Sequence, residues 1–171
     1  PTAQIVHELT VPALTAFQSY GAVENGQFRY LSPPTPGSSN AQTAFEGIVE
    51  APVFGIPGGF YDNQVSVSLF SGTTGASIRY TTDGSEPTET TGLAYSSPIN
   101  VPRPATVNSP GVVIRARAFK AGMLPSQTKT NTYLINQSVG RRSVPALCIT
   151  GDQQRTLYRP LGLMAIVGGA F

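Results

Sequence analysis

The sequence has no tryptophan, one cysteine and one histidine among its 171 residues. Because Cys148 is alone, no disulfide can form within the chain, and cysteine usage says nothing about its redox compartment. Any catalytic group built on histidine would have to use His7, which lies far along the sequence from Cys148. We therefore expect His7 to be a surface or packing residue, and we predict that the chain is not an enzyme.

Charge is also scarce, at 12% of residues with a formal net charge of +2. No run of lysine or arginine is interleaved with aromatic residues, which argues against nucleic acid as a partner. The nine acidic residues are scattered over turn-like segments, so they do not indicate the carboxylate pair that glycoside hydrolysis needs. We expect the pairs Arg115/Arg117 and Arg141/Arg142 to lie on solvated strand faces.

The apolar segment from Leu161 to Phe171 has 11 residues, whereas a membrane-spanning helix needs about 20. The chain is therefore not predicted to be transmembrane. We expect this segment to be a core strand of a domain that is only partly present, since the chain begins at Pro1 and ends within the segment. Left exposed, it would favour self-association, for example by strand addition to a neighbour's edge.

Glycine (18 residues) and proline (15 residues) are abundant, and threonine, serine and valine recur. Proline breaks helices, whereas strands rich in Thr, Val, Ile and Tyr between Gly/Pro turns are typical of sandwiches. We predict an all-β fold, an antiparallel immunoglobulin/fibronectin-III-like sandwich with extended flanking segments. The sparse charge and the high content of Thr, Ser and Gly favour an extracellular or cell-surface location in a bacterium.

The sandwich is predicted over residues 52–135, where short alternating segments are separated by turns about every 8–12 residues. From Val112 to Lys120, for example, the positions of Ile114, Ala116 and Ala118 alternate with those of two arginines. The other predicted strands are Val49 with Val53 and Phe54, Gln64 to Phe70, Ser77 to Thr82, an interrupted edge strand at Ala94–Tyr95 and Pro98 to Val101, and Thr128 to Ile135.

The flanks are predicted to hold shorter elements. Residues 1–40 contain two predicted strands, Ile5 to Val11 and Phe28 to Leu31, with turn-like residues at 18–21 and a hairpin turn at Asn25-Gly26. Residues 41–51 are assigned to a linker. Within residues 136–171, Val144 to Ile149 predicts a buried strand, and Asp152 predicts the cap of a helix from Gln153 to Tyr158.

The most informative stretch is Ser77 to Thr88, with the sequence SIRYTTDGSEPT. It predicts a strand and then a tight turn at Asp83-Gly84, because glycine accepts positive φ and aspartate can bond the backbone ahead of it. The candidate binding residues are Tyr80 and Tyr95, which with Tyr61 and Tyr133 could stack on sugars, and Asp83 and Glu86, which with Glu89 could ligate Ca²⁺. The structural alternative is an Asx turn at Asp83, a solvated Glu86 and a packed Tyr80. No cofactor, resident metal or catalytic residue is predicted.

Several motifs together resemble a known family. They are Gly59-Phe60-Tyr61, Val65-Ser66-Val67, the run from Ala76 to Thr88, Tyr95, Ile114-Arg115-Ala116, Lys120-Ala121-Gly122, Ser126 and Thr132-Tyr133. This set resembles the chitobiase/β-hexosaminidase C-terminal type of domain, a fibronectin-III-like sandwich. Residues 1–40, through Ser19-Tyr20-Gly21 and the run from Pro33 to Asn40, resemble the end of a bacterial lamin-tail domain. Residues 136–171, through Val144 to Leu147 and Leu161 to Met164, resemble the start of a CotH-type kinase-like domain.

The order of these three resemblances is similar to that of large multidomain proteins predicted to lie at bacterial surfaces. It implies a non-catalytic structural, spacer or assembly module whose partners are other domains of the same polypeptide. One alternative is a carbohydrate-binding accessory module that contacts polysaccharide, and another is a fragment of a CotH-like kinase. The resemblance carries over no catalytic residue and no nucleotide or metal site.

Overall fold

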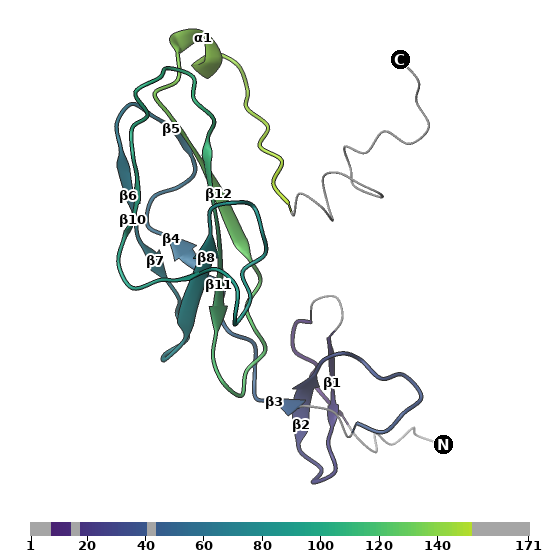
Figure 1. Ribbon diagram of the computed structural model, residues 1–171. Helices are drawn as coiled ribbons and strands as arrows, with labels where there is room; N and C mark the ends of the chain where they lie inside the picture. The colour runs from purple at the N-terminus through teal and green to yellow at the C-terminus, as the bar shows by residue number, and fades with distance from the viewer. Residues whose placement is uncertain (1–7, 15–17, 41–43, 152–171) are drawn as a thin grey trace, which may run out of the picture. The chain divides into compact units, whose positions relative to one another are not determined.

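The computed structural model describes residues 8–14, 18–40 and 44–151, and these residues are almost entirely β-structure or connecting turns (Figure 1). The chain divides into two compact units. One comprises Pro1–Ile48 with Ala121–Leu124, and the other comprises Val49–Lys120 with Pro125–Phe171. The prediction of an all-β fold is confirmed.

The first unit is built on a three-stranded antiparallel sheet of β1 (Ser19–Ala22), β2 (Phe28–Leu31) and β3 (Ala44–Phe45). The predicted hairpin between β1 and β2 is confirmed, with Gly26 at a φ of 77°. The Asn25 side-chain oxygen accepts a hydrogen bond of 3.0 Å from the Gln27 N–H, which fixes the turn.

Three details of this unit differ from the sequence-based expectation. The turn predicted at residues 18–21 is instead part of β1, because Tyr20 pairs with Tyr30 across the strands, with ring centroids 5.2 Å apart. The segment assigned to a linker contains β3, where Phe45 lies opposite Tyr30. The strand predicted from Ile5 is not formed at residues 8–11, and its first part, including His7, lies outside the described residues.

The second unit is a sandwich (Figure 1). Its larger sheet has five strands in the order β5 (Gly59–Tyr61), β12 (Lys129–Ile135), β11 (Val112–Phe119), β8 (Ser77–Thr81) and β9 (Leu93–Ala94). The facing layer pairs β4 (Val53–Phe54) with β7 (Leu69–Phe70), and β6 (Val65–Val67) with β10 (Ile99–Val101).

Two predicted strands of the sandwich are divided in the structure. The segment from Gln64 to Phe70 alternates as predicted, but it splits at Ser68 into β6 and β7, whose partners differ. The interrupted edge strand becomes β9 in the five-stranded sheet and β10 in the facing layer. The chain therefore crosses from one layer to the other between these two strands.

One pairing departs from the expected antiparallel arrangement. β5 runs parallel to β12, with Phe60 opposite Leu134. β5 lies near the start of the sandwich, and β12 is its last strand. Because the two strands run in the same direction, the chain enters the sandwich at the end where β12 begins and leaves it at the end where β12 ends. Figure 1 shows this course, with α1 following β12 at one end of the sandwich.

The sandwich core is formed by apolar side chains from both layers. Val67 and Val101 of the facing layer and Ile114 of β11 are at most 1% exposed, and Tyr133 of β12 is completely buried. The predicted alternation of β11 is confirmed, since Ile114, Ala116 and Ala118 are buried while Arg115 and Arg117 are on the opposite face. Each large core side chain contributes about 1.5–3 kcal/mol to stability by leaving water.

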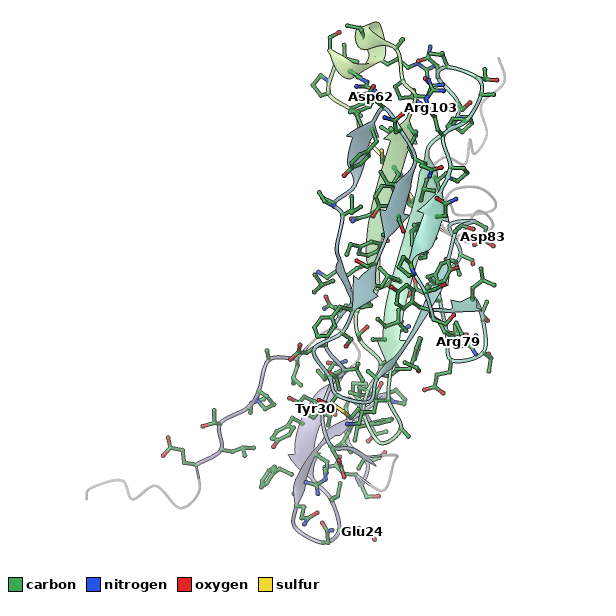
Figure 2. All side chains as sticks on the ribbon, turned by 90° about the vertical axis from the view of Figure 1, so that its left-hand side faces the viewer. Glu24, Tyr30, Asp62, Arg79, Asp83 and Arg103 are labelled. Atoms are coloured by element: carbon green, nitrogen blue, oxygen red, sulfur yellow. The ribbon has the colours of Figure 1, made fainter. Side chains whose placement is uncertain are left out.

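The chain leaves the sandwich through the short helix α1 (Val139–Arg142). The guanidinium of Arg142 pairs with the Asp62 carboxylate, and the Nε of Arg103 donates to the Asp62 backbone oxygen over 3.0 Å. Figure 2 shows Asp62 and Arg103 close together at this end of the sandwich. Arg141 and Arg142 therefore lie on a helix rather than on the expected strand face.

The segment after α1 also differs from its prediction. Val144 to Ile149 forms no strand, and Leu147 is 86% exposed. Asp152, the helix predicted after it and the apolar segment from Leu161 to Phe171 lie outside the described residues, so the expected self-association stays a prediction. In the described part of the chain, no helix has the length and apolar character needed to cross a membrane.

Candidate functional site

The predicted acidic turn follows β8 directly. The Asp83 Oδ1 accepts hydrogen bonds from the backbone N–H of Ser85 over 3.0 Å and from the Ser85 hydroxyl over 2.6 Å. These two bonds lower the pKa of Asp83 below its ordinary value of 3.8. Gly84 has a φ of +84°, a conformation that favours glycine. The Asx turn predicted at Asp83 is confirmed.

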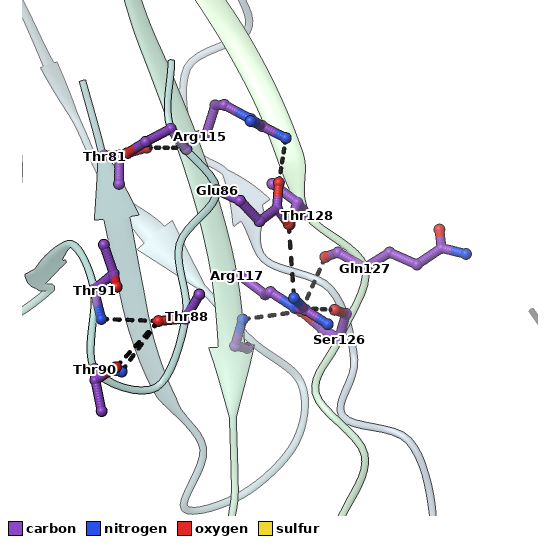
Figure 3. A network of polar contacts seen from close by, with 12 residues as sticks. Thr81, Glu86, Thr88, Thr90, Thr91, Arg115, Arg117, Ser126, Gln127 and Thr128 are labelled. Atoms are coloured by element: carbon purple, nitrogen blue, oxygen red, sulfur yellow. Dashed lines mark hydrogen bonds and ion pairs between the residues drawn. The ribbon is translucent and has the colours of Figure 1, made fainter. Parts of the chain in front are cut away.

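Glu86 is engaged with the outer face of the five-stranded sheet. Its carboxylate accepts hydrogen bonds from Arg115 on β11 and from the Thr128 hydroxyl, and it lies 3.6 Å from the Arg117 guanidinium (Figure 3). The prediction of a solvated Glu86 is wrong, and so is that of a solvated face for Arg115 and Arg117. The two arginines are two residues apart on one strand, so both point to the same side and converge on this carboxylate.

The ion pair between Glu86 and Arg115 is partly buried rather than fully exposed to solvent. The Arg115 side chain is 16% exposed and the Glu86 side chain 42% exposed. Arg115 also donates to the Gly84 backbone oxygen over 2.8 Å, so one guanidinium holds both the carboxylate and the backbone of the turn. Pro87, which follows Glu86, is buried and packs the turn against the sheet. We call the set Glu86, Arg115, Arg117 and Thr128 the acidic-turn latch.

The two acidic side chains considered as Ca²⁺ ligands are engaged with different partners. Glu86 faces two arginines, whereas Asp83 is directed to Ser85. No group of three or more His, Cys, Asp or Glu side chains that could hold a metal ion occurs among the described residues. The acidic turn therefore has the chemistry of a structural connection.

The four tyrosines of the sandwich do not form an exposed row. Tyr133 is completely buried, and its hydroxyl donates to the Ile56 backbone oxygen over 2.8 Å. Burial raises the pKa of Tyr133 above its ordinary value. Tyr61 donates to the Pro57 oxygen over 2.7 Å, and its ring lies against that of Tyr133 with centroids 6.1 Å apart. These two tyrosines have structural partners.

Tyr80 and Tyr95 have different surroundings. Tyr80 lies on β8 opposite Ala116, on the side that faces the core, and is half-buried. Tyr95 follows β9, where its backbone N–H donates to the Ile78 oxygen over 2.9 Å. Its half-buried side chain lines a groove, so Tyr95 is the candidate residue that is placed beside an open space. The structure does not bring Tyr95 together with the acidic turn into one site.

The described part of the sandwich unit has grooves, of which two concern the candidate residues and the sheet beside them. The first, of about 420 Å³, lies between Tyr95 and the chain from Leu69 to Ile78, and we call it the β7–β8 groove. The second, of about 490 Å³, is lined by β5 and β12 residues including Phe60, Thr130 and Thr132, and by Cys148. Sequence patterns missed both, although Tyr95 was identified as a candidate binding residue.

The comparisons with known proteins agree with this geometry. Residues 56–130, from the approach to β5 to the second residue of β12, match the family model of the chitobiase/beta-hexosaminidase C-terminal domain. No curated protein and no solved structure gave a match. The lamin-tail and CotH-type resemblances of the flanks stay predictions. The C-terminal domain of chitobiase, which the matched model describes, is a non-catalytic accessory domain.

Proposed function

We propose that this chain is a non-catalytic spacer module of a secreted or cell-surface bacterial multidomain protein. The observation that carries the proposal is the course of the chain through the sandwich. β5, near the start of the sandwich, runs parallel to the last strand, β12, and the chain enters and leaves at opposite ends of the unit. A module with this connectivity separates the segments that it joins by its own length.

The contacts at the exit end support this role. Arg103 donates to the Asn136 side chain over 2.8 Å as well as to the Asp62 backbone, and the Asn136 amide donates to the Pro104 oxygen over 3.0 Å. The Ser138 N–H donates to the Asn108 side chain over 2.8 Å. These bonds tie the start of α1 to two loops of the sandwich. Because these bonds hold α1 against the sandwich, the direction in which the chain continues is set by the orientation of the sandwich.

The latch supports a role without catalysis. Its carboxylate is held by two arginines and a threonine. A side chain so engaged serves the fold. The resemblance to a non-catalytic accessory domain is consistent with this interpretation.

A distance measurement between the two ends tests the spacer role. We would replace Cys148 by serine and attach spin labels at Glu50→Cys, next to the first residue of the unit, and at Gly140→Cys in α1, two positions that are exposed. Pulsed electron resonance should give one narrow distance distribution that denaturant broadens. The matched control is the pair Ser66→Cys and Asn100→Cys, which lie opposite each other on β6 and β10. A distribution between the ends as broad in native buffer as in denaturant would reject the spacer role.

A second candidate function is that of a carbohydrate-binding accessory module. It is favoured by the match of residues 56–130 and by the presence of an uncharged groove beside Tyr95. The two functions are compatible, since a spacer can also hold its protein against a polysaccharide. Binding to a glycan would test the second function independently of the distance measurement.

A further inference from the structure

We propose that the β7–β8 groove is a binding site for a neutral oligosaccharide. The inference deepens the second candidate function by naming its site and ligand class, and it does not depend on the spacer role. The groove is lined by residues 69–78 and Tyr95, all within the sandwich.

The lining of the groove selects the class of ligand. Its lining residues include no charged side chain, and the Glu50 carboxylate that lies against Gly72 would repel a phosphate or a carboxylate. It does contain two aromatic rings, those of Phe70 and Tyr95, and the hydroxyls of Ser71, Thr73, Thr74 and Ser77. A ligand that suits both has an apolar face and hydroxyl groups at its edges. Sugar rings have this combination.

Phe70 supplies an accessible ring. It is 67% exposed and lies opposite Val53, which is 61% exposed, in the β4–β7 pair. The neighbouring Leu69 is the residue of β7 that enters the core, at 6% exposure. An isolated exposed aromatic side chain needs no explanation. Here, however, the ring lines a groove together with a second aromatic residue.

The polar groups of the groove fall into two sets. Some hold the turn in shape: the Ser71 hydroxyl donates to the Glu50 oxygen over 3.0 Å, and the Thr73 hydroxyl accepts from the Glu50 N–H over 2.8 Å. The hydroxyls of Thr74 and Tyr95, by contrast, make no hydrogen bond with the described part of the chain. The second set can therefore bond a ligand without breaking a contact of the fold.

The groove is also held in place before a ligand arrives. The Ala76 N–H donates to the Thr73 oxygen over 3.1 Å, and Gly75 has a φ of +75°. Tyr95 is fixed by its backbone bond to Ile78 on β8. Preformed sites lose less conformational freedom on binding. The groove therefore has the rigidity expected of a binding site.

Nuclear magnetic resonance titration of the full chain tests the proposal. The probes are chitotetraose and cellotetraose, which are neutral, and an oligogalacturonate, which is acidic. We expect a neutral probe to shift the amide signals of residues 70–78 and 95. Phe70→Ala and Tyr95→Ala should each weaken binding roughly tenfold, because each removes one stacking ring. Tyr95→Phe should have a smaller effect, since it keeps the ring and removes only the hydroxyl.

The matched controls are Val53→Ala, the exposed cross-strand neighbour of Phe70, and Leu93→Ala, which is 60% exposed and outside the groove. Both should bind like the parent chain. Dispersed spectra will show that each variant is folded. The proposal is overturned if no neutral probe shifts the groove amides, if only the acidic probe does, or if folded Phe70→Ala and Tyr95→Ala bind unchanged. Shifts confined to residues 58–60 and 130–134 would assign binding to the other groove and also overturn it.

Discussion

The two turns that flank β8 have opposite character. The turn after it, from Asp83 to Thr88, carries the residues that look most like a site, yet Asp83 and Glu86 are both bonded within the sandwich. The turn before it, from Ser71 to Ala76, has no charged residue, yet it lines a groove and leaves the Thr74 hydroxyl without a partner in the described chain. Polar groups that are hydrogen-bonded within the chain stabilise the fold, whereas polar groups without such bonds are free to bind a ligand.

The largest effect is expected from breaking the latch. Glu86→Ala would leave Arg115 and Arg117 facing each other's charge without their carboxylate. We expect the free energy of unfolding to fall by about 1–3 kcal/mol, less than for a fully buried pair because Glu86 is 42% exposed. Urea denaturation measures the loss. The control is Glu89→Ala, an exposed residue of the same loop, for which a change within about 0.5 kcal/mol is expected. Equal losses for the two variants would contradict the latch.

A somewhat smaller effect is expected at the base of the same turn. Thr81 is 5% exposed, and its hydroxyl donates to the Ser85 backbone oxygen over 2.6 Å. Thr81→Val keeps the shape of the side chain but removes this donor, which should cost about 1–2 kcal/mol. Thermal unfolding measures it. Thr82→Val, at the exposed neighbouring position, is the control, and an equal drop there would mean that the hydrogen bond is unimportant.

Removing the ring of Phe70, on the strand before β8, should lower the free energy of unfolding by a smaller amount. Phe70→Ala removes a side chain that is 67% exposed, so only its contact with Val53 across the strands is lost. A cross-strand pair contributes up to about 1 kcal/mol, and the loss in urea denaturation should stay below that. A loss as large as that of Glu86→Ala would show that Phe70 serves the core rather than the groove.

The smallest effect is expected in the decrease of Tm at acidic pH. A carboxyl whose folded-state pKa is lowered contributes stability above its unfolded pKa, and this contribution is lost as the pH falls through the folded-state value. The Ser85 bonds lower the pKa of Asp83, and Arg142 lowers that of Asp62. The Tm of the parent chain should therefore decrease below about pH 4. Asp83→Asn, which keeps an acceptor oxygen but does not titrate, should show a shallower decrease.

The double variant Asp62→Asn, Asp83→Asn should show the shallowest decrease of all. Tm is measured at intervals from neutral pH to acid, with Glu89→Gln as the control that leaves both lowered carboxyls in place. An acid limb that is identical in the parent chain and the double variant would contradict the assignment of these two carboxyls.

Much of the sandwich could be predicted from local pattern. The alternation in β11 and the Asx turn at Asp83 depend on neighbouring residues, and both predictions are confirmed. The partners of Glu86 could not be predicted in the same way. Arg115 is 29 positions and Thr128 is 42 positions away in sequence, and only the sheet order brings β11 and β12 beside the turn.

The same reason explains the missed groove and the wrong strand at Val144. Tyr95 meets residues 69–78 because β9 pairs with β8, a contact that no local pattern records. The apolar residues from Val144 to Ile149 predicted a buried strand, but burial requires a neighbour, and among the described residues nothing covers Leu147. Likewise, the sequence of neither strand alone predicts that β5 pairs in parallel with β12.

Oligosaccharide titration of Glu86→Gln and Phe70→Ala, followed by amide signals under conditions in which both variants are folded, tests the central contrast most directly. We predict that Glu86→Gln binds the neutral probe like the parent chain although it is less stable, whereas Phe70→Ala is nearly as stable as the parent chain and binds roughly tenfold more weakly. Loss of binding in folded Glu86→Gln, with Phe70→Ala unaffected, would place the site at the acidic turn and contradict the account.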